Sequence, residues 1–93
     1  MIISFSCKET KKISDGKISL KFPRDIQYRA LGKLRQLDAA SCVDDLRMPS
    51  SNHLEKLKGD LSNEISIRIN NQWRLCFIWE DGGVHNVRIA DYH

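Results

Sequence analysis

Residues that could carry acid–base chemistry on a phosphate ester gather in the second half of the sequence. They combine cations, a carboxylate, a phenol and an imidazole: Glu55, Lys58, Arg68, Arg74, Tyr92 and His93. Strand scission by attack of a 2′-hydroxyl needs a base for the hydroxyl proton, cations for the charge of the transition state, and an acid for the departing 5′-oxygen. These residue types suit a metal-free ribonuclease, and Tyr92 adds a ring on which an unstacked base could rest.

Two further basic residues are candidates for binding RNA. Lys56 follows Glu55 directly, and Arg88 lies on the predicted strand 84–91, on the same face of the sheet as Arg68. The acidic residues are scattered, and no two carboxylates have an evident common face. The three cysteines are far apart and lack both a Cys-x-x-Cys pair and a histidine at ligand spacing, which argues against zinc and against a disulfide framework. We therefore predict no metal site and no cofactor.

Strict alternation predicts two adjacent strands that bury one face. Apolar residues occupy every second position in two runs: Ile65, Ile67 and Ile69, then Trp73, Leu75, Phe77 and Trp79. A three-residue loop at 70–72 opposes Ile67 to Leu75, whereas a two-residue loop would mix the faces. This register places Arg68 opposite Arg74 on the face away from the core. Two like charges in that position destabilise the pair unless an anion joins them.

Helical spacing of apolar residues predicts a helix from about Asp25 to Asp38, with Asp25 as its N-cap. A second, short helix begins at Ser41 and ends at Met48-Pro49, because proline and the small polar residues after it stop a helix. The remaining predicted segments are a short strand at 2–5, a Lys-rich loop or mobile arm at 6–15, and a strand at 84–91.

Length and composition describe one domain, 1–93, with 41% hydrophobic and 29% charged residues. The first 35 residues hold nine basic and three acidic residues (+6), and the remainder hold six and nine (−3). The basic part could contact an acidic protein or the phosphates of a nucleic acid. The candidate contacts are Lys8, Lys11, Lys12, Arg29 and Lys33. The sequence shows no secretory signal and no apolar run near the roughly 20 residues of a membrane span, so we expect a cytoplasmic protein with no membrane partner.

Four ordered segments resemble the HigB toxins of the RelE/ParE superfamily. They are Leu57-Lys58-Gly59-Asp60, the run from Ile65 to Asn70, the run from Gln72 to Phe77, and the closing Asp91-Tyr92-His93, and Leu37-Asp38-Ala39-Ala40 extends the likeness. The resemblance implies an α+β fold in which two helices from the N-terminal half pack on one face of a small antiparallel sheet. It assigns catalytic positions to Lys58, Arg74, Tyr92 and His93. Some relatives carry a histidine where this chain has Glu55, so the general base is left open. His53 lies two residues away, and its spacing does not favour it as a substitute.

The resemblance also implies a function and its partners. The chain would be the toxin of a type II toxin–antitoxin pair that cuts messenger RNA in the A site of the 30S ribosomal subunit. Its partner would be a helix-turn-helix antitoxin of the HigA type, through which alone it would meet operator DNA. Two other functions stay open: a ParE-like poison of DNA gyrase, and a non-catalytic module that binds RNA or the ribosome. Tyr92 and His93 favour the nuclease, because neither alternative needs them.

Overall fold

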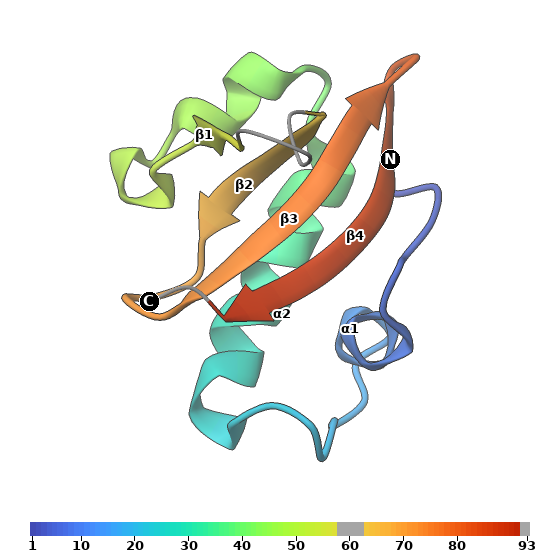
Figure 1. Cartoon of the computed structure of the whole chain (residues 1–93), viewed down its shortest axis with the longest axis vertical. Coiled ribbons are helices and arrows are strands. Elements are labelled where there is room, and N and C mark those ends of the chain that lie inside the picture. The colour runs from blue at the N-terminus through green and yellow to red at the C-terminus, as the bar shows by residue number, and fades with distance from the viewer. Residues whose placement is uncertain (58–62, 92–93) are drawn as a thin grey trace.

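An antiparallel sheet with its strands in sequential order, β1-β2-β3-β4, is the centre of the computed structural model, which describes residues 1–57 and 63–91. The strands are β1 (Glu55–Lys56), β2 (Glu64–Arg68), β3 (Trp73–Glu80) and β4 (Gly83–Asp91), and the helices are α1 (Lys8–Ser14), α2 (Arg24–Ala39) and the 3₁₀ helices η1 (Val43–Arg47) and η2 (Ser50–Asn52). Figure 1 shows α2 crossing behind the sheet and α1 beside β4. These helices on a small antiparallel sheet confirm the expected α+β class.

The β2–β3 hairpin has the register predicted from the sequence. Ile67 pairs with Leu75, and Arg68 pairs with Arg74. The turn closes with a hydrogen bond of 2.8 Å from the Ile69 amide to the Trp73 carbonyl. The Asn70 side chain accepts hydrogen bonds from two further amides of the turn, those of Gln72 and Trp73, as asparagine commonly does in turns. The three-residue loop therefore keeps the apolar side chains on one face.

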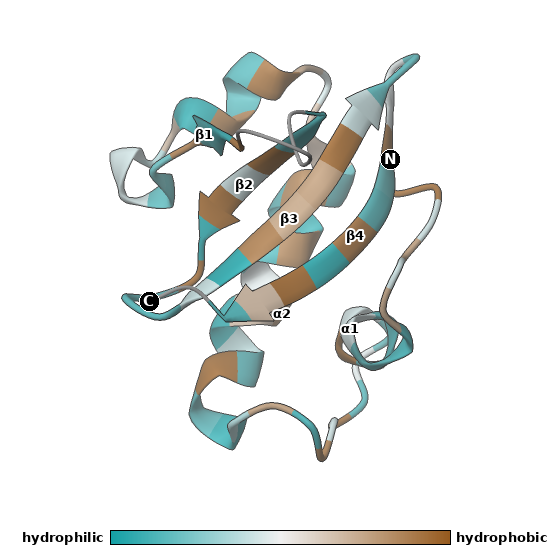
Figure 2. Ribbon diagram, in the orientation of Figure 1, coloured by the Kyte–Doolittle hydropathy of each residue, from teal (hydrophilic) through white to brown (hydrophobic). Residues whose placement is uncertain are grey.

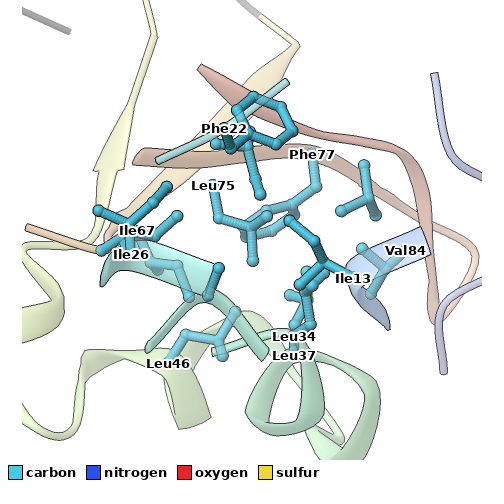
Figure 3. Close-up of a cluster of buried hydrophobic side chains, with 14 residues drawn as sticks. Ile13, Phe22, Ile26, Leu34, Leu37, Leu46, Ile67, Leu75, Phe77 and Val84 are labelled. Atoms are coloured by element: carbon cyan, nitrogen blue, oxygen red, sulfur yellow. The ribbon is translucent and has the colours of Figure 1, made fainter. Parts of the chain in front are cut away.

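The core lies between that face and α2. Figure 3 shows Ile26, Leu34 and Leu37 of α2 gathered against Leu75 and Phe77 of β3. Each of these side chains is at most 1% exposed. Figure 2 shows β4 alternating between hydrophilic and hydrophobic residues, whereas the middle of β3 is hydrophobic without a break. Residues 74–77 of β3 are all buried, so both faces of the strand are covered there, whereas the alternation predicted one buried face.

The N-terminal segment differs from its predicted structure. Residues 8–14 form α1 instead of a loop or mobile arm, because Thr10 and Ile13 are buried against the sheet and α2. The Thr10 hydroxyl accepts a hydrogen bond of 3.0 Å from the Ile89 amide on the outer edge of β4. The expected strand at 2–5 is reduced to two isolated parallel bridges with β4. Tertiary contacts thus override a local pattern that lacks helical periodicity.

Smaller differences concern the other helices and the sheet edge. α2 begins at Arg24 with Pro23 at its N-cap position, so Asp25 lies in the first turn rather than at the cap. The short helix expected after Ser41 is the 3₁₀ helix η1. The edge strand β1 was not predicted, because its two residues are exposed and show no alternation. Among the described residues, no helix has the length and hydropathy needed to cross a membrane.

A buried side chain, that of Gln27, bonds to the backbone of the linker between α1 and α2. Its carbonyl oxygen accepts a hydrogen bond of 3.0 Å from the Ser19 amide. Its amide nitrogen donates to the carbonyl oxygens of Ser19 and Phe22, both at 2.8 Å. Gln27 therefore satisfies three backbone groups that would otherwise be buried without partners.

Replacing Gln27 with alanine should lower the free energy of unfolding by about 1–3 kcal/mol, because buried backbone groups lose their partner. The matched control is Tyr28→Ala at the next position, where the side chain is 87% exposed and the change should stay within about 0.5 kcal/mol. Urea denaturation followed by circular dichroism measures both. Equal destabilisation by the two substitutions would contradict this account of the linker.

Candidate active site

The structure brings three of the six predicted chemical residues to one hollow. Glu55, Arg68 and Arg74 line a depression of about 280 Å³ together with His53, Asn70 and Asn71. The other three, Lys58, Tyr92 and His93, lie outside the described residues. The structure therefore unites cations with a carboxylate and adds an imidazole that the sequence analysis did not favour.

Strand pairing explains why these side chains meet. β1 pairs with β2 so that Glu55 lies opposite Ser66. Ser66 lies two positions before Arg68 on β2, and side chains two apart on a strand point to the same face. Because Arg68 pairs with Arg74, three neighbouring strands present Glu55 and both arginines on the same face of the sheet. The hollow is a direct result of the hairpin register and the edge strand.

Arg74 is more deeply buried and more extensively hydrogen-bonded than the sequence indicated. It is only 8% exposed, although it was expected to lie outside the packed part of the protein. Its Nε donates to the Ser66 hydroxyl at 2.8 Å, and one terminal nitrogen donates to the Ser66 carbonyl at 3.2 Å and to the His53 carbonyl. The guanidinium therefore ties β2, β3 and the turn at His53 together.

His53 lies in the hollow because of the turn between η2 and β1. Its backbone is left-handed, with φ of 45°, and its carbonyl accepts the hydrogen bond from Arg74. Its side chain is exposed and lines the same hollow as Glu55. An imidazole can accept or donate a proton near neutral pH, and a carboxylate can accept one. Both are thus available beside two guanidinium groups.

The His53 turn rests on Asn52, a fully buried side chain that the sequence analysis did not single out. The Asn52 amide nitrogen donates to the Leu46 carbonyl at 3.0 Å and to the Gln36 side chain at 3.3 Å. Its carbonyl oxygen accepts a hydrogen bond from the Lys33 ammonium. Asn52 thereby joins η1, η2 and α2 beneath the turn. No local pattern marks such a residue, because all of these partners are distant or irregular in sequence.

A second, larger hollow adjoins the first. It has a volume of about 430 Å³ and shares Arg68, Asn70 and Asn71 with the smaller one. Arg29 and Lys33 of α2 line its other side. Burial, and secondly the neighbouring Arg29 charge, lower the pKa of the Lys33 ammonium. These two predicted contacts of the basic N-terminal part therefore lie next to the arginines of the sheet.

The other predicted contacts lie elsewhere. Arg88 forms an ion pair with Glu64 at 2.8 Å. Lys56 lines a separate hollow of about 420 Å³ beside Trp79. Lys8, Lys11 and Lys12 are on α1, where Lys11 pairs with Asp15 and Lys12 with Glu9. None of these residues is among those that line the two adjoining hollows.

Two further observations limit the chemistry. Cys76 is fully buried, and this burial raises the pKa of its thiol, so a thiolate nucleophile is disfavoured there. Within residues 1–57 and 63–91, no group of three or more His, Cys, Asp or Glu side chains is placed to hold a metal ion. The described chemical groups are therefore two guanidinium cations, a carboxylate and an imidazole.

Replacing Arg74 with alanine should destabilise the fold as well as change the site. Each buried group that loses its donor costs about 1–3 kcal/mol, and Arg74→Lys should cost less because an ammonium retains the charge and part of the bonding. Arg47→Ala is the control, because the Arg47 side chain is 66% exposed and its ion pair in the described part of the chain is with exposed Asp44. Urea denaturation of the three variants measures the difference. An unfolding free energy of Arg74→Ala equal to that of Arg47→Ala would refute the anchoring role.

Comparison with known proteins places the chain in a family. A family model described as the RelE-like toxin HigB of type II toxin–antitoxin systems matches residues 5–93. Toxin HigB-1 of Vibrio cholerae is 44% identical over 68 residues, which cover 73% of this chain and 72% of the relative. Endoribonuclease HigB of Proteus vulgaris is 28% identical over 93 residues, the full length of both chains.

Solved structures of low sequence identity share the fold. A mutant of YafQ from E. coli superimposes with a TM-score of 0.64 at 11% identity, over 98% of this chain and 93% of that one. The YoeB–YefM complex from Staphylococcus aureus gives a TM-score of 0.57 at 19% identity, over 100% of this chain and 98% of its match. The resemblance recognised in the sequence is thus confirmed, and the chain belongs to the HigB-like family of RelE-like toxins from type II toxin–antitoxin systems.

Proposed function

We propose that this toxin is an endoribonuclease that cuts messenger RNA on the ribosome by metal-free acid–base chemistry. The observation that carries the proposal is the hollow in which Arg68 and Arg74 lie with Glu55 and His53. A relative that matches the full chain is named Endoribonuclease HigB, which supports a nuclease over the other functions of this fold. Attack of the 2′-hydroxyl on the adjacent phosphate forms a cyclic phosphate and breaks the bond to the 5′-oxygen.

The hollow supplies two of the three requirements of this reaction. Arg68 and Arg74 provide positive charge where the phosphate gains negative charge in the transition state. Glu55 or His53 is available to take the proton of the 2′-hydroxyl. The resemblance to HigB toxins adds Lys58, Tyr92 and His93 as catalytic groups, and a proton donor for the 5′-oxygen is expected among them. These three assignments rest on the sequence.

The proposal extends to the partners. Membership of a toxin–antitoxin family implies an antitoxin, and a matching solved structure is itself a complex, YoeB–YefM. We propose an antitoxin of the helix-turn-helix HigA type, and the 30S A site as the place where messenger RNA is cut. We propose that the toxin meets the antitoxin and the ribosome in the cytoplasm.

Induced expression of the wild type should arrest growth and leave translated messages cut internally. Arg68→Ala should reduce cleavage by roughly 10²–10³-fold, the usual effect of removing one transition-state donor. It should fold, because its one side-chain hydrogen bond in the described structure is from Nε to the Asn70 carbonyl of its own turn. A chain ending at Asp91 tests the roles of Tyr92 and His93, and Arg47→Ala is the control that should stay toxic. Growth and mapping of RNA 5′-ends are the measurements.

Other results would redirect the assignment. Arrest with intact messages and broken DNA would identify a gyrase poison. Arrest with neither lesion would indicate a module that blocks the ribosome by binding alone. If cleavage persists in a culture whose translation initiation is blocked, the proposed dependence on the ribosome is refuted. Full activity of Arg68→Ala would refute the assignment of the hollow.

A further inference from the structure

The larger hollow is surrounded by cations that no described acid neutralises. Arg29 and Lys33 of α2 face Arg68 of β2 across it. Within residues 1–57 and 63–91, the ion pairs are Lys11–Asp15, Lys12–Glu9, Arg47–Asp44 and Arg88–Glu64, and none involves these three cations. No acidic side chain is among the described residues that line the hollow. Three cations around one depression attract an anion.

The remaining lining of the hollow suits a phosphate. Asn70, Asn71, Gln72 and Ser51 contribute amide and hydroxyl groups that can donate hydrogen bonds. Lys33 is partly buried beside Arg29, and the burial, followed by the like charge of Arg29, lowers the pKa of its ammonium. An anion between Arg29 and Lys33 would relieve this repulsion. The volume of about 430 Å³ exceeds what a lone ion needs and lies within the usual range of ligand sites.

The hollow is continuous with the proposed cleavage site. Arg68, Asn70 and Asn71 line both depressions, so a strand whose phosphate lies by Arg74 can continue past Arg68 toward α2. We infer that the larger hollow is a second phosphate subsite, in which Arg29 and Lys33 hold the RNA backbone beside the cleaved bond. The inference rests on the proposed nuclease function and adds residues of α2 to substrate binding.

An RNA strand fits this hollow better than an acidic protein does. The residues between its cations are polar, with Ile69 as the one apolar side chain among those lining it in the described structure. The exposed apolar residues that favour a protein partner lie elsewhere, because Ile18 and Tyr28 line a different hollow near the start of α2. Backbone phosphates need only cations and hydrogen-bond donors, and this hollow offers both.

The test is binding of a short single-stranded RNA that is fully 2′-O-methylated, so that it cannot be cut. Fluorescence anisotropy over a series of KCl concentrations gives the affinity and the slope of its logarithm against the logarithm of salt concentration. Each lost phosphate contact on a single strand should reduce the magnitude of that slope by about 0.7. We expect this reduction, with several-fold weaker binding, in Arg29→Gln and in Lys33→Gln. Arg29→Lys should restore most of the slope, because it retains the charge.

Arg35→Gln is the matched control, since Arg35 is an exposed arginine of the same helix that lies by another hollow, with Asp38. Its slope should equal that of the wild type. Because Lys33 also bonds to Asn52, the exposed Arg29 provides the variant whose fold should be unaffected. Wild-type slopes in both Arg29→Gln and Lys33→Gln, an equal loss in Arg35→Gln, or no binding by the wild type would overturn the inference. The inference would also be overturned if Arg29→Gln and Lys33→Gln bound RNA like the wild type but no longer bound the antitoxin.

The two proposals fail in distinguishable ways. Messages that are cut in cells while Arg29→Gln keeps the wild-type slope would reject the subsite and leave the nuclease assignment intact. Messages that stay intact while Arg29→Gln lowers the slope would reject the nuclease and retain a phosphate site for RNA.

Discussion

The register of the β2–β3 hairpin places the apolar side chains of both strands on one face, and that register fixes the arginines of the site. Ile67 and Leu75 are directly opposed and fully buried. A slip of one residue would turn every side chain of the strand to the other face, so the burial of this core strongly disfavours it. Arg68 and Arg74 must then oppose each other away from α2. The positions of the two cations are therefore a consequence of hydrophobic burial, not of an attraction between them.

Two opposed guanidinium groups persist because each is bonded to backbone oxygens. Arg68 donates to the Asn70 carbonyl, and Arg74 donates to the carbonyls of Ser66 and His53. Hydrogen bonds from charged donors are stronger than neutral ones and hold the two heads in place. The arrangement costs electrostatic energy in the free protein, and a bound phosphate would lower that cost. Cations that are already in position need little reorganisation when charge develops on a substrate.

Hydrogen bonds that involve Lys33 and Asn52 connect the two hollows. Lys33 lines the larger hollow and donates to Asn52, which lies directly before His53. The His53 carbonyl in turn accepts the hydrogen bond from Arg74 at the floor of the smaller hollow. Side chains from α2, η2 and β3 thus form one connected network. The His53 backbone is bonded on both sides, because its amide donates to the Ser50 carbonyl and its carbonyl accepts from Arg74.

The sequence predicted the hairpin and the opposed arginines, because period-two burial is a local signal, and the resemblance to HigB toxins implied the class of fold. It did not predict α1, whose helix depends on Thr10 and Ile13 contacting distant elements. It also missed the burial of Arg74 and the role of Asn52, since both are defined by contacts with segments that are far apart in the chain. His53 was recognised as an imidazole, but its position depends on a left-handed turn that residue types alone do not specify.

Net charge alone does not distinguish among the cations of the basic N-terminal third. Its nine cations are spread over α1, the linker and α2. The structure pairs Lys11 and Lys12 with acids of α1, so those charges are partly neutralised within the chain. Arg29 and Lys33 have no such partner among the described acids and face the hairpin that carries Arg68. A cation without a counter-charge beside a hollow is better evidence of an anionic ligand than an excess of lysine in the sequence. The field of such a cation is not cancelled within the protein, so it can attract an anionic partner.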